Sequence, residues 1–382
     1  MRLLLEAGIP EGVLQLLPGR GETVGAGLVG DERVKGVMFT GSTEVARLLQ
    51  RNVAGRLDAQ GRPIPLIAET GGQNAMIVDS SALTEQVVID VVSSAFDSAG
   101  QRCSALRVLC LQEDCADRVI EMLKGAMAQN RMGNPERLSV DVGPVIDAEA
   151  KAGIEKHIQA MREKGRSVYQ VALAEGEECK RGTFVMPTLI ELESFDELKR
   201  EIFGPVLHVV RYNRKHIDQL IEQINASGYG LTLGVHTRID ETIAKVVDKV
   251  NAGNMYVNRN IVGAVVGVQP FGGEGLSGTG PKAGGPLYLY RLLSTRPADA
   301  IARHFQHTDA HGKADNALHE QLLKPLHALK TWASSHQPEL VALCEQFAEQ
   351  SQSGITRVLP GPTGERCPAS TCCAWPTTKP TC

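Results

Sequence analysis

Short apolar runs alternate along this chain with longer stretches whose apolar residues fall at helical spacing. Residues 75–78 and 106–111 are typical of buried strands, whereas residues 83–94 and 117–129 have the pattern of amphipathic helices. Such alternation requires crossover connections, so we expect parallel sheets covered by helices, an α/β fold. Further strands are predicted at residues 34–39, 206–212, 232–236 and 254–258, and further helices at residues 44–50, 217–226 and 241–250.

The bulk properties narrow the class of protein. The 382 residues suffice for two domains with large cores, and a net charge of −4 gives no basic field for nucleic acid. No apolar run approaches the roughly 18 residues of a membrane-spanning helix. The cysteines of residues 1–366 show no paired spacing, which favours a reducing compartment over a disulfide framework. We therefore expect a cytoplasmic protein without a membrane span.

The two ends of the chain differ from its middle. It opens on an apolar helical turn at residues 3–8, and beyond residue 297 it continues into two predicted amphipathic helices at residues 317–334 and 339–349. Residues 367–382 contain four cysteines but no acidic residue and no histidine, and their spacing matches no zinc pattern. We interpret this tail as disordered, with a shifted reading frame as its explanation, and we predict no metal site.

One cysteine lies in a setting suited to chemistry. It belongs to the segment Ser98-Ala-Gly-Gln-Arg-Cys-Ser104, and a glutamate lies upstream in Ala68-Glu-Thr-Gly-Gly72. Glycine lets backbone N–H groups approach a thiolate closely, and a carboxylate from another element can serve as general base. We therefore predict Cys103 as a nucleophile and Glu69 as its base. The alternatives are an inert core thiol and an ordinary surface carboxylate.

Another glycine segment, Phe39-Thr-Gly-Ser-Thr-Glu44, follows a predicted strand and opens a predicted helix. In that geometry the N–H groups of the first helical turn can bind a pyrophosphate. The signal is weak by itself because Gly and Ser cap many helices. It gains meaning only in combination with the other segments.

The three segments above, followed by Glu201-Ile-Phe-Gly-Pro205 and Pro270-Phe-Gly-Gly273, form an ordered set that resembles the aldehyde dehydrogenase superfamily. The resemblance covers about residues 3–297. Residues 262–273 and 277–285 are more closely similar to the glutamate-semialdehyde (pyrroline-5-carboxylate) dehydrogenase branch, as found in the dehydrogenase module of bifunctional proline utilization proteins.

The resemblance implies an aldehyde dehydrogenase-like fold with an incomplete Rossmann-type nucleotide domain, an α/β catalytic domain and a helical C-terminal extension. The superfamily's nucleotide domain begins earlier, and its oxyanion asparagine and its ribose-binding lysine have no counterpart here, so we expect a fragment. The expected parts are the end of the NAD-binding domain at residues 1–67, the catalytic domain at 68–258, a substrate-anchor and oligomerisation segment at 259–297, the start of a helical domain at 298–366, and the tail at 367–382.

NAD is the cofactor that the resemblance implies. Glu201 would bind the nicotinamide ribose hydroxyls, and Phe203 would pack beside it unless that ring is simple core packing. Ala46 replaces a second glycine of the family's phosphate segment. The other residues expected near the cofactor are Gly21, Gly25, Phe39, Gly41, Ser42 and Thr70, with Gly21 and Gly25 at a strand-to-helix turn.

The resemblance also implies which residues would bind the substrate. A short acidic semialdehyde needs its α-carboxylate held, and adjacent backbone N–H groups on a glycine-containing loop make an anion nest. Gly263 and Ala264 would supply these amides, Ser104 would add a hydroxyl, and Phe271 would wall the aliphatic part. The alternative is that residues 262–267 form only a flexible loop.

The function that we expect is NAD-dependent oxidation of L-glutamate γ-semialdehyde to L-glutamate in proline catabolism. Cys103 would form a thiohemiacetal, hydride loss would leave a thioester, and Glu69 would activate the water that hydrolyses it. The resemblance also implies a proline dehydrogenase module in the full-length protein and a homo-oligomer. Two alternatives stay open: an inactive fragment with an oligomerising or structural role, and a CoA-acylating aldehyde dehydrogenase, which commonly lacks such a base.

Overall fold

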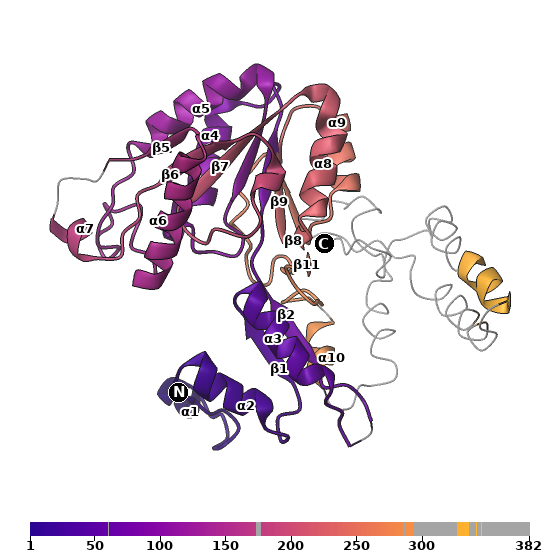
Figure 1. The fold of residues 1–382 in the computed structure, drawn as a ribbon. Coiled ribbons are helices and arrows are strands. Elements are labelled where there is room, and N and C mark those ends of the chain that lie inside the picture. Colours follow the sequence, from indigo (N-terminus) through magenta and orange to yellow (C-terminus); the bar gives the residue numbers. More distant parts are fainter. Residues whose placement is uncertain are drawn as a thin grey trace. The chain divides into compact units, whose positions relative to one another are not determined.

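The computed structural model describes residues 1–59, 61–172, 177–285, 287–293 and 327–335, together with residues 341 and 345. The chain divides into two compact units, Met1–Ala68 and Glu69–Cys382 (Figure 1). The smaller unit contains the predicted pyrophosphate segment, and the larger unit contains the candidate cysteine and both candidate glutamates.

The larger unit is built on a seven-stranded sheet. All neighbouring strands run parallel except β5, which is antiparallel to β6. The predicted parallel sheet of an α/β fold is therefore confirmed. In spatial order the strands are β10 Asn254–Val257, β9 Thr232–His236, β3 Ala75–Val78, β4 Val108–Gln112, β7 Val206–Tyr212, β6 Thr188–Leu192 and β5 Val168–Gln170.

The central strands β3 and β4 are apolar except for Gln112 at the end of β4, as expected where both faces of the sheet are covered. Every residue of β3 and β4 is buried. The register places Met76 beside Leu109 and Leu109 beside Val209, and all three side chains are fully enclosed. This row forms the middle of the core and fixes the ends of the strands, from which the site loops emerge.

Helices fill the connections between the strands (Figure 1). Figure 1 shows α5 and α6 toward the β5 side of the sheet and α8 and α9 toward the β9 side. On α8, Asp218 receives ion pairs from Lys245 and Lys249 of α9, which joins these two helices. The helices are α4 Thr84–Phe96, α5 Glu113–Met127, α6 Ala148–Glu163, α7 Glu177–Arg181, α8 Ile217–Ala226 and α9 Asp240–Lys249.

A small antiparallel pair returns the chain toward the start of the larger unit. Strand β8 Tyr229–Gly230 pairs with β11 Glu274–Gly275. Just beyond it, Gly278 forms an isolated bridge with Glu69. These pairings bring the glycine-rich segment after Pro270 against the predicted base. Helix α10 Tyr288–Leu292 follows.

The smaller unit has its own small core, formed by Val29, Val53, Leu66 and Ala68. Arg56 closes it by donating to the carbonyl oxygens of Val29, Asp31 and Val34. Its elements are α1 Arg2–Glu6, a π-helix at Gly21–Gly25, α2 Ala26–Gly30, β1 Val37–Thr40, α3 Thr43–Ala54, and β2 Leu66–Glu69, which pairs with β1.

Several predicted elements have the expected bounds, and others differ for local reasons. The strands at 75–78, 206–212 and 232–236 and the helix at 217–226 are confirmed. Two strands were predicted too long at their start. The Val34 N–H donates to Asp31 in a turn, so β1 begins at Val37, and the Leu106 N–H donates to Ser94, so β4 begins at Val108.

The remaining differences are shifted helix ends and elements that the sequence pattern did not reveal. Helix α5 begins at Glu113 rather than residue 117, because it starts directly where β4 ends. Strands β2, β5 and β6 and helix α6 were not predicted. In α6 the buried residues are few among charged ones, which weakens the helical pattern.

The C-terminal predictions are only partly covered. Residues 327–335, the described part of the predicted helix at 317–334, are helical. The predicted helix at 339–349, apart from residues 341 and 345, and the tail at 367–382 lie outside the described residues. Within the described part of the chain, no helix has the length and apolar character needed to cross a bilayer.

Candidate active site

The loop that carries Cys103 begins with three consecutive residues in the left-handed region of backbone space. Their φ angles are 56° for Ser98, 54° for Ala99 and 64° for Gly100. A Cβ at Gly100 would lie 2.2 Å from the carbonyl oxygen of Gly204, so this position requires glycine. Left-handed non-glycine residues each cost on the order of 1–2 kcal/mol, and such strain persists only where surrounding contacts fix it.

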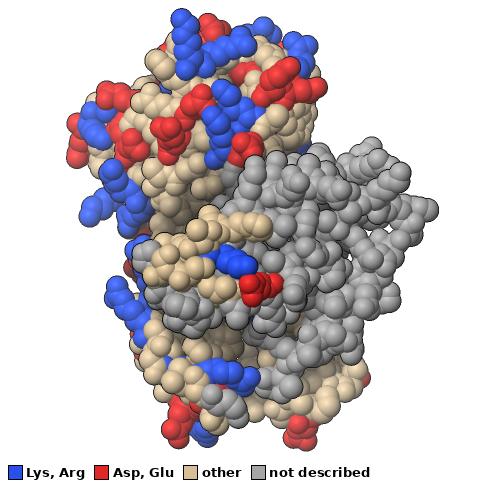
Figure 2. All heavy atoms as spheres, turned by 90° about the vertical axis from the view of Figure 1, so that its right-hand side faces the viewer, with Lys and Arg blue, Asp and Glu red and all other residues tan. Residues whose placement is uncertain are grey.

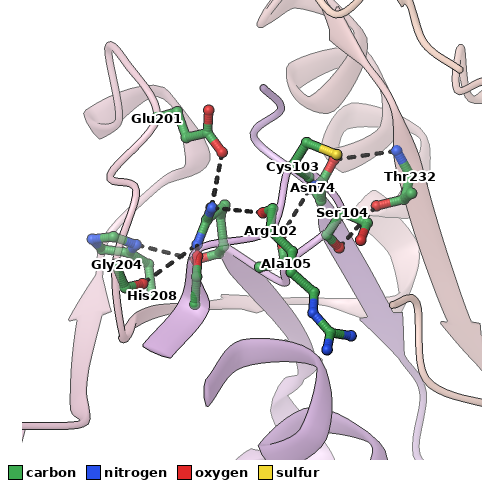
Figure 3. A network of polar contacts seen from close by, with 11 residues as sticks. Asn74, Arg102, Cys103, Ser104, Ala105, Glu201, Gly204, His208 and Thr232 are labelled. Atoms are coloured by element: carbon green, nitrogen blue, oxygen red, sulfur yellow. Dashed lines mark hydrogen bonds and ion pairs between the residues drawn. The ribbon is translucent and has the colours of Figure 1, made fainter. Parts of the chain in front are cut away.

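Asn74 is the first of these fixing contacts (Figure 3). Its buried amide nitrogen donates to the carbonyl oxygens of Cys103, at 2.7 Å, and Ala105, at 2.8 Å. Its amide oxygen accepts from the Thr232 N–H at 3.1 Å. Asn74 therefore links the cysteine loop to the start of β9.

Gln101 ties the same loop to a second segment of the chain. Its side-chain oxygen accepts from the Ile146 N–H at 2.8 Å, and its side-chain nitrogen donates to the Pro144 carbonyl at 3.2 Å. The two bonds form a bidentate clamp. The middle of the cysteine segment is thereby held independently of Asn74.

Arg107 holds the loop from the other side and is almost completely buried, with 1% of its side chain exposed. Its guanidinium donates to the carbonyl oxygens of Gly100 at 2.6 Å, Arg102 at 3.0 Å and Gly204 at 3.3 Å. Its Nε and Nη2 atoms both donate to Oε1 of Glu201, at 3.1 and 2.9 Å. One cation thus joins the cysteine loop to the predicted ribose ligand.

Glu201 and Phe203 lie on the segment between β6 and β7. A Cβ at Gly71 would collide with Oε2 of Glu201 at 1.6 Å, so the carboxylate lies directly on the Glu69-Thr-Gly-Gly bend. The Phe203 ring is 44% exposed, and the Arg107 guanidinium lies 5.1 Å from its centroid. The core-packing alternative for Phe203 is therefore wrong.

Glu69 lies in a pocket of glycines. Its Oε2 accepts from the Gly273 N–H at 3.2 Å, and a Cβ at Gly272 or Gly278 would lie 3.3 or 2.9 Å from its carboxylate oxygens. Burial raises the pKa of Glu69 to about 7, and the Gly273 hydrogen bond opposes that rise. A carboxyl group that titrates near neutral pH suits a general base, and its burial excludes the surface-carboxylate alternative.

The Pro270-Phe-Gly-Gly273 segment is held in place by Asn254. The Asn254 side chain donates to the Pro270 carbonyl at 2.9 Å and accepts from the Gly272 N–H at 3.2 Å. A Cβ at Gly253 would lie only 1.9 Å from the Gly272 oxygen. The backbone around Gly273, whose N–H donates to Glu69, is therefore held by hydrogen bonds with Asn254 and by the close approach of Gly253 to Gly272.

Cys103 is free and partly exposed, so it is not a fully buried core thiol. Burial raises the pKa of its thiol, and the Glu201 carboxylate raises it further. The backbone N–H groups of Ser104 and of Cys103 itself act on the pKa in the opposite direction. The net effect of these surroundings is a raised pKa of the Cys103 thiol.

The predicted substrate residues lie in two places. Ser104 is buried beside Cys103, and its carbonyl accepts from Thr232 at 3.3 Å. Gly263 follows the buried Ile261 and lies against the Arg259 guanidinium, while Ala264 is exposed. Both places are linked through one residue: Ser94 accepts from the Ile261 N–H at 3.1 Å and from the Leu106 N–H at 2.8 Å.

Phe271 and Thr70 are held by backbone pairing. Phe271 forms an antiparallel bridge with Ala283, with hydrogen bonds of 2.9 and 2.8 Å. Thr70 is buried, and its hydroxyl donates to the Leu276 carbonyl at 2.5 Å. The Thr70 hydroxyl hydrogen is therefore already used, and only the oxygen could accept a hydrogen bond from a cofactor. The role of Thr70 in cofactor binding stays a prediction.

In the smaller unit, Phe39 lies on β1 and Ser42 is the N-cap of α3, where its hydroxyl accepts from the Val45 N–H at 3.3 Å. The predicted strand, glycine turn and helix are confirmed. At Gly41 a Cβ would meet the Phe39 ring at 2.4 Å.

The position expected for Gly21 and Gly25 is wrong. Both lie in a five-residue π-helix that continues into α2, and residues 11–20 before it form turns and irregular backbone rather than a strand. The turn-forming Pro18 and Gly19 in that stretch account for the missing strand.

Among the described residues, no group of three or more His, Cys, Asp or Glu side chains could hold a metal ion. Three of the described histidines lie beside another histidine or beside a carboxylate. His157 and His208 face each other with Nε2 atoms 2.9 Å apart, and burial lowers the pKa of both. His236 lies 3.5 Å from Asp90.

Asn74, Gln101, Arg107 and Asn254 are the site residues that sequence reasoning missed. Only Arg107 carried a signal, because a charged residue between Leu106 and the apolar strand that follows must find a buried partner. The other three are polar residues whose partners are backbone groups distant in sequence.

The fold and the site define an α/β protein with a candidate thiol nucleophile and a buried candidate base. The chain belongs to the aldehyde dehydrogenase family, whose profile matches residues 1–296. It is 73% identical over 367 residues to the bifunctional protein PutA of Klebsiella aerogenes, covering 95% of this chain and 28% of that protein. The chain therefore spans less than a third of the length of this curated relative.

Other relatives and solved structures match a smaller share of the chain. A 1-pyrroline-5-carboxylate dehydrogenase of Bacillus cereus is 37% identical over 291 residues, covering 76% of this chain and 55% of the other. A crystal structure of a bifunctional proline utilization A protein is 53% identical with a TM-score of 0.71, covering 76% of this chain and 29% of the other. A Thermus 1-pyrroline-5-carboxylate dehydrogenase with bound NAD is 37% identical with a TM-score of 0.70, covering 76% and 55%.

Gly100 offers a direct test of the strained loop. Gly100→Ala should lower the free energy of unfolding by about 1–3 kcal/mol, because it combines a left-handed φ with a collision at the Gly204 oxygen. Thermal and denaturant unfolding measure the effect. The control is Gly125→Ala at an exposed position of α5, where open space surrounds the new Cβ and helix propensity predicts about 0.5–1 kcal/mol of stabilisation. Equal effects of the two changes would contradict this account.

Proposed function

We propose that this chain is part of an enzyme that oxidises L-glutamate γ-semialdehyde to L-glutamate with NAD in proline catabolism. The names of its 1-pyrroline-5-carboxylate dehydrogenase relatives support the substrate, and the NAD-bound Thermus structure supports the cofactor. The observation that carries the proposal is a thiol loop joined by one buried cation to Glu201, with Glu69 titrating near neutral pH.

Cys103 performs the first step. Once the thiol has lost its proton to solvent, the sulfur adds to the aldehyde carbon and forms a carbon–sulfur bond, and the π electrons of the carbonyl move to its oxygen. The resulting oxyanion makes the carbon a hydride donor. The backbone N–H of Cys103 is the donor offered to that oxyanion, a type of contact that commonly contributes about 2.7–4 kcal/mol. Hydride acceptance is the chemistry that NAD supplies when bound.

Glu69 performs the second step. The thioester left on Cys103 is hydrolysed when water attacks its carbonyl carbon, and Glu69 accepts the proton of that water. The carbon–sulfur bond then breaks, releasing the acid and the thiol. The near-neutral pKa of Glu69 provides an ionised base at physiological pH. This base favours hydrolysis over acyl transfer to CoA.

The residues present fit the cofactor within each unit. The Glu201 carboxylate lies so close to Gly71 that a side chain at position 71 would collide with it. A carboxylate in this place is suited to accept hydrogen bonds from two ribose hydroxyls. In the smaller unit, the capped N-terminus of α3 after Gly41 and Ser42 provides backbone N–H groups for a pyrophosphate. Phe203 would pack beside the nicotinamide half.

The substrate's α-carboxylate would be held by the amides of Gly263 and Ala264 and the hydroxyl of Ser104. Phe271 would wall its aliphatic part. This placement of the substrate is supported by Ser94, which accepts hydrogen bonds both from Ile261, just before Gly263, and from Leu106, just after the cysteine segment.

The organisation of the whole protein is also part of the proposal. The PutA relatives are named bifunctional, which supports a proline dehydrogenase module in the full-length protein. We further propose a cytoplasmic homo-oligomer and the division at residues 67, 258, 297 and 366. An inactive structural fragment is the outcome to expect if the chain by itself binds no NAD.

Loss of the nucleophile tests the proposal directly. In the full-length gene product, Cys103→Ala should abolish semialdehyde oxidation, measured as NADH formation, and should remove thiol-directed labelling at this site. Cys115→Ala, at a partly exposed cysteine on α5, serves as the control and should leave activity intact. Residual activity above about a tenth of the parent would refute the assignment.

Glu69 is tested by pH and by transient kinetics. Turnover should rise as pH increases through about 7, because only the ionised carboxylate can accept the proton of water. Glu69→Gln should remove this rise and slow thioester hydrolysis more than hydride transfer, which stopped-flow would record as a burst of NADH before slow turnover. Equal slowing of both steps would contradict a role in hydrolysis.

Substrate choice is tested with aldehydes of equal length. A charged hydrogen bond contributes about 1.5–3 kcal/mol, so the semialdehyde should be preferred over an uncharged analogue by roughly ten- to a hundred-fold in kcat/KM. Ser104→Ala should raise KM for the semialdehyde and barely affect the uncharged aldehyde. Ala264→Pro should be worse, because proline removes a backbone donor. Equal efficiency on both aldehydes would mean that the loop is only a wall.

A further inference from the structure

Arg107 is a buried charge that none of the proposed chemical steps uses. It lies where the cysteine loop enters β4, and all three guanidinium nitrogens are engaged. Two of these contacts go to carbonyl oxygens on the loop before Cys103, at Gly100 and Arg102. The others go to Glu201 and to Gly204, on a segment about a hundred residues later in the sequence.

The chemistry of arginine suits this arrangement. Its planar guanidinium has five N–H donors in a fixed fork, whereas lysine has three donors on one freely rotating nitrogen. The Nε and Nη2 atoms approach the same oxygen of Glu201, Nη2 also donates to the Arg102 carbonyl, and Nη1 donates to the carbonyls of Gly100 and Gly204. A lysine at this position would retain the charge, but it could not hold both partners in this geometry.

We propose that Arg107 is a positioning residue that sets the placement of the Cys103 thiol relative to the Glu201 carboxylate, and so relative to the cofactor ribose. The inference rests on the proposed function for the role of Glu201. The hydrogen bond from Arg107 to the Gly100 carbonyl is one of the contacts that hold the strained backbone of Ser98, Ala99 and Gly100. A change in the Arg107–Glu201 pair therefore alters a contact that places the thiol.

Charge supports the same reading. Burial lowers the pKa of Arg107, while the Glu201 carboxylate and the Cys103 sulfur both raise it. The cation therefore interacts favourably with both anions that the mechanism needs. It also offsets the repulsion between Glu201 and a Cys103 thiolate.

The test compares Arg107→Lys with Arg211→Lys in the full-length gene product. Arg211 is a partly exposed arginine on β7 that also makes carboxylate ion pairs, with Asp117 and Glu191. Arg107→Lys should weaken NAD⁺ binding, measured by calorimetry, by about tenfold or more, and should lower kcat by a similar factor. It should also shift the pH profile of Cys103 alkylation by iodoacetamide. Arg211→Lys should stay within about twofold of the parent in all three.

A second variant covers the case in which Arg107→Lys does not fold. Glu201→Gln leaves Arg107 in place but removes its ionic partner, and it should speed amide hydrogen exchange at residues 98–105 in the cofactor-free protein. Unchanged exchange there, or an Arg107→Lys protein with lower Tm but parental NAD⁺ affinity, kcat and alkylation profile, would overturn the inference. If the parent protein does not oxidise the semialdehyde, the proposed function fails, while the exchange and alkylation readouts still decide the role of Arg107.

Discussion

A buried positive charge must be neutralised and hydrogen-bonded, and this requirement organises the site of the larger unit. Arg107 meets it with the carboxylate of Glu201 and with three carbonyl oxygens, two of them on the loop that presents Cys103. The left-handed turn before the cysteine, the close approach of Gly100 to Gly204, and the Phe203 ring all lie around these contacts. The seven-stranded sheet contributes rigid strand ends on which they are built.

The two candidate catalytic groups are placed in different environments, which separates their chemistry. Cys103 is met by backbone donors and lies in the field of Glu201 and Arg107. Glu69 lies among glycines with a single donor, so that burial dominates its titration. A base held near neutrality argues against a CoA-acylating reaction, which has no use for activated water. Whether the chain is only an inactive structural fragment is decided by NAD binding, because the predicted nucleotide site is divided between residues of the smaller unit and residues of the larger unit.

Much of the fold could be predicted from the sequence because the core strands have uninterrupted apolar patterns. Strands β3, β7 and β9 and helix α8 have their predicted bounds. The misses are elements whose pattern is weak, such as α6, or whose ends depend on a distant partner, as when Ser94 takes the Leu106 N–H away from β4. Gly21 and Gly25 were placed at a strand-to-helix turn because the alternating pattern suggested a strand that the turn-forming residues before them do not form.

The sequence by itself determined the family, the α/β class and the residue types of the chemistry, since glycine turns, a cysteine and glutamates in order carry that information locally. The tertiary structure decided how these segments meet. It placed the Glu201 carboxylate on Gly71, the Gly273 N–H on Glu69, and Asn74 and Arg107 on the two sides of the cysteine loop. These contacts join residues far apart in the chain, and hydrogen bonds to backbone carbonyls leave no pattern in the sequence because every residue has one.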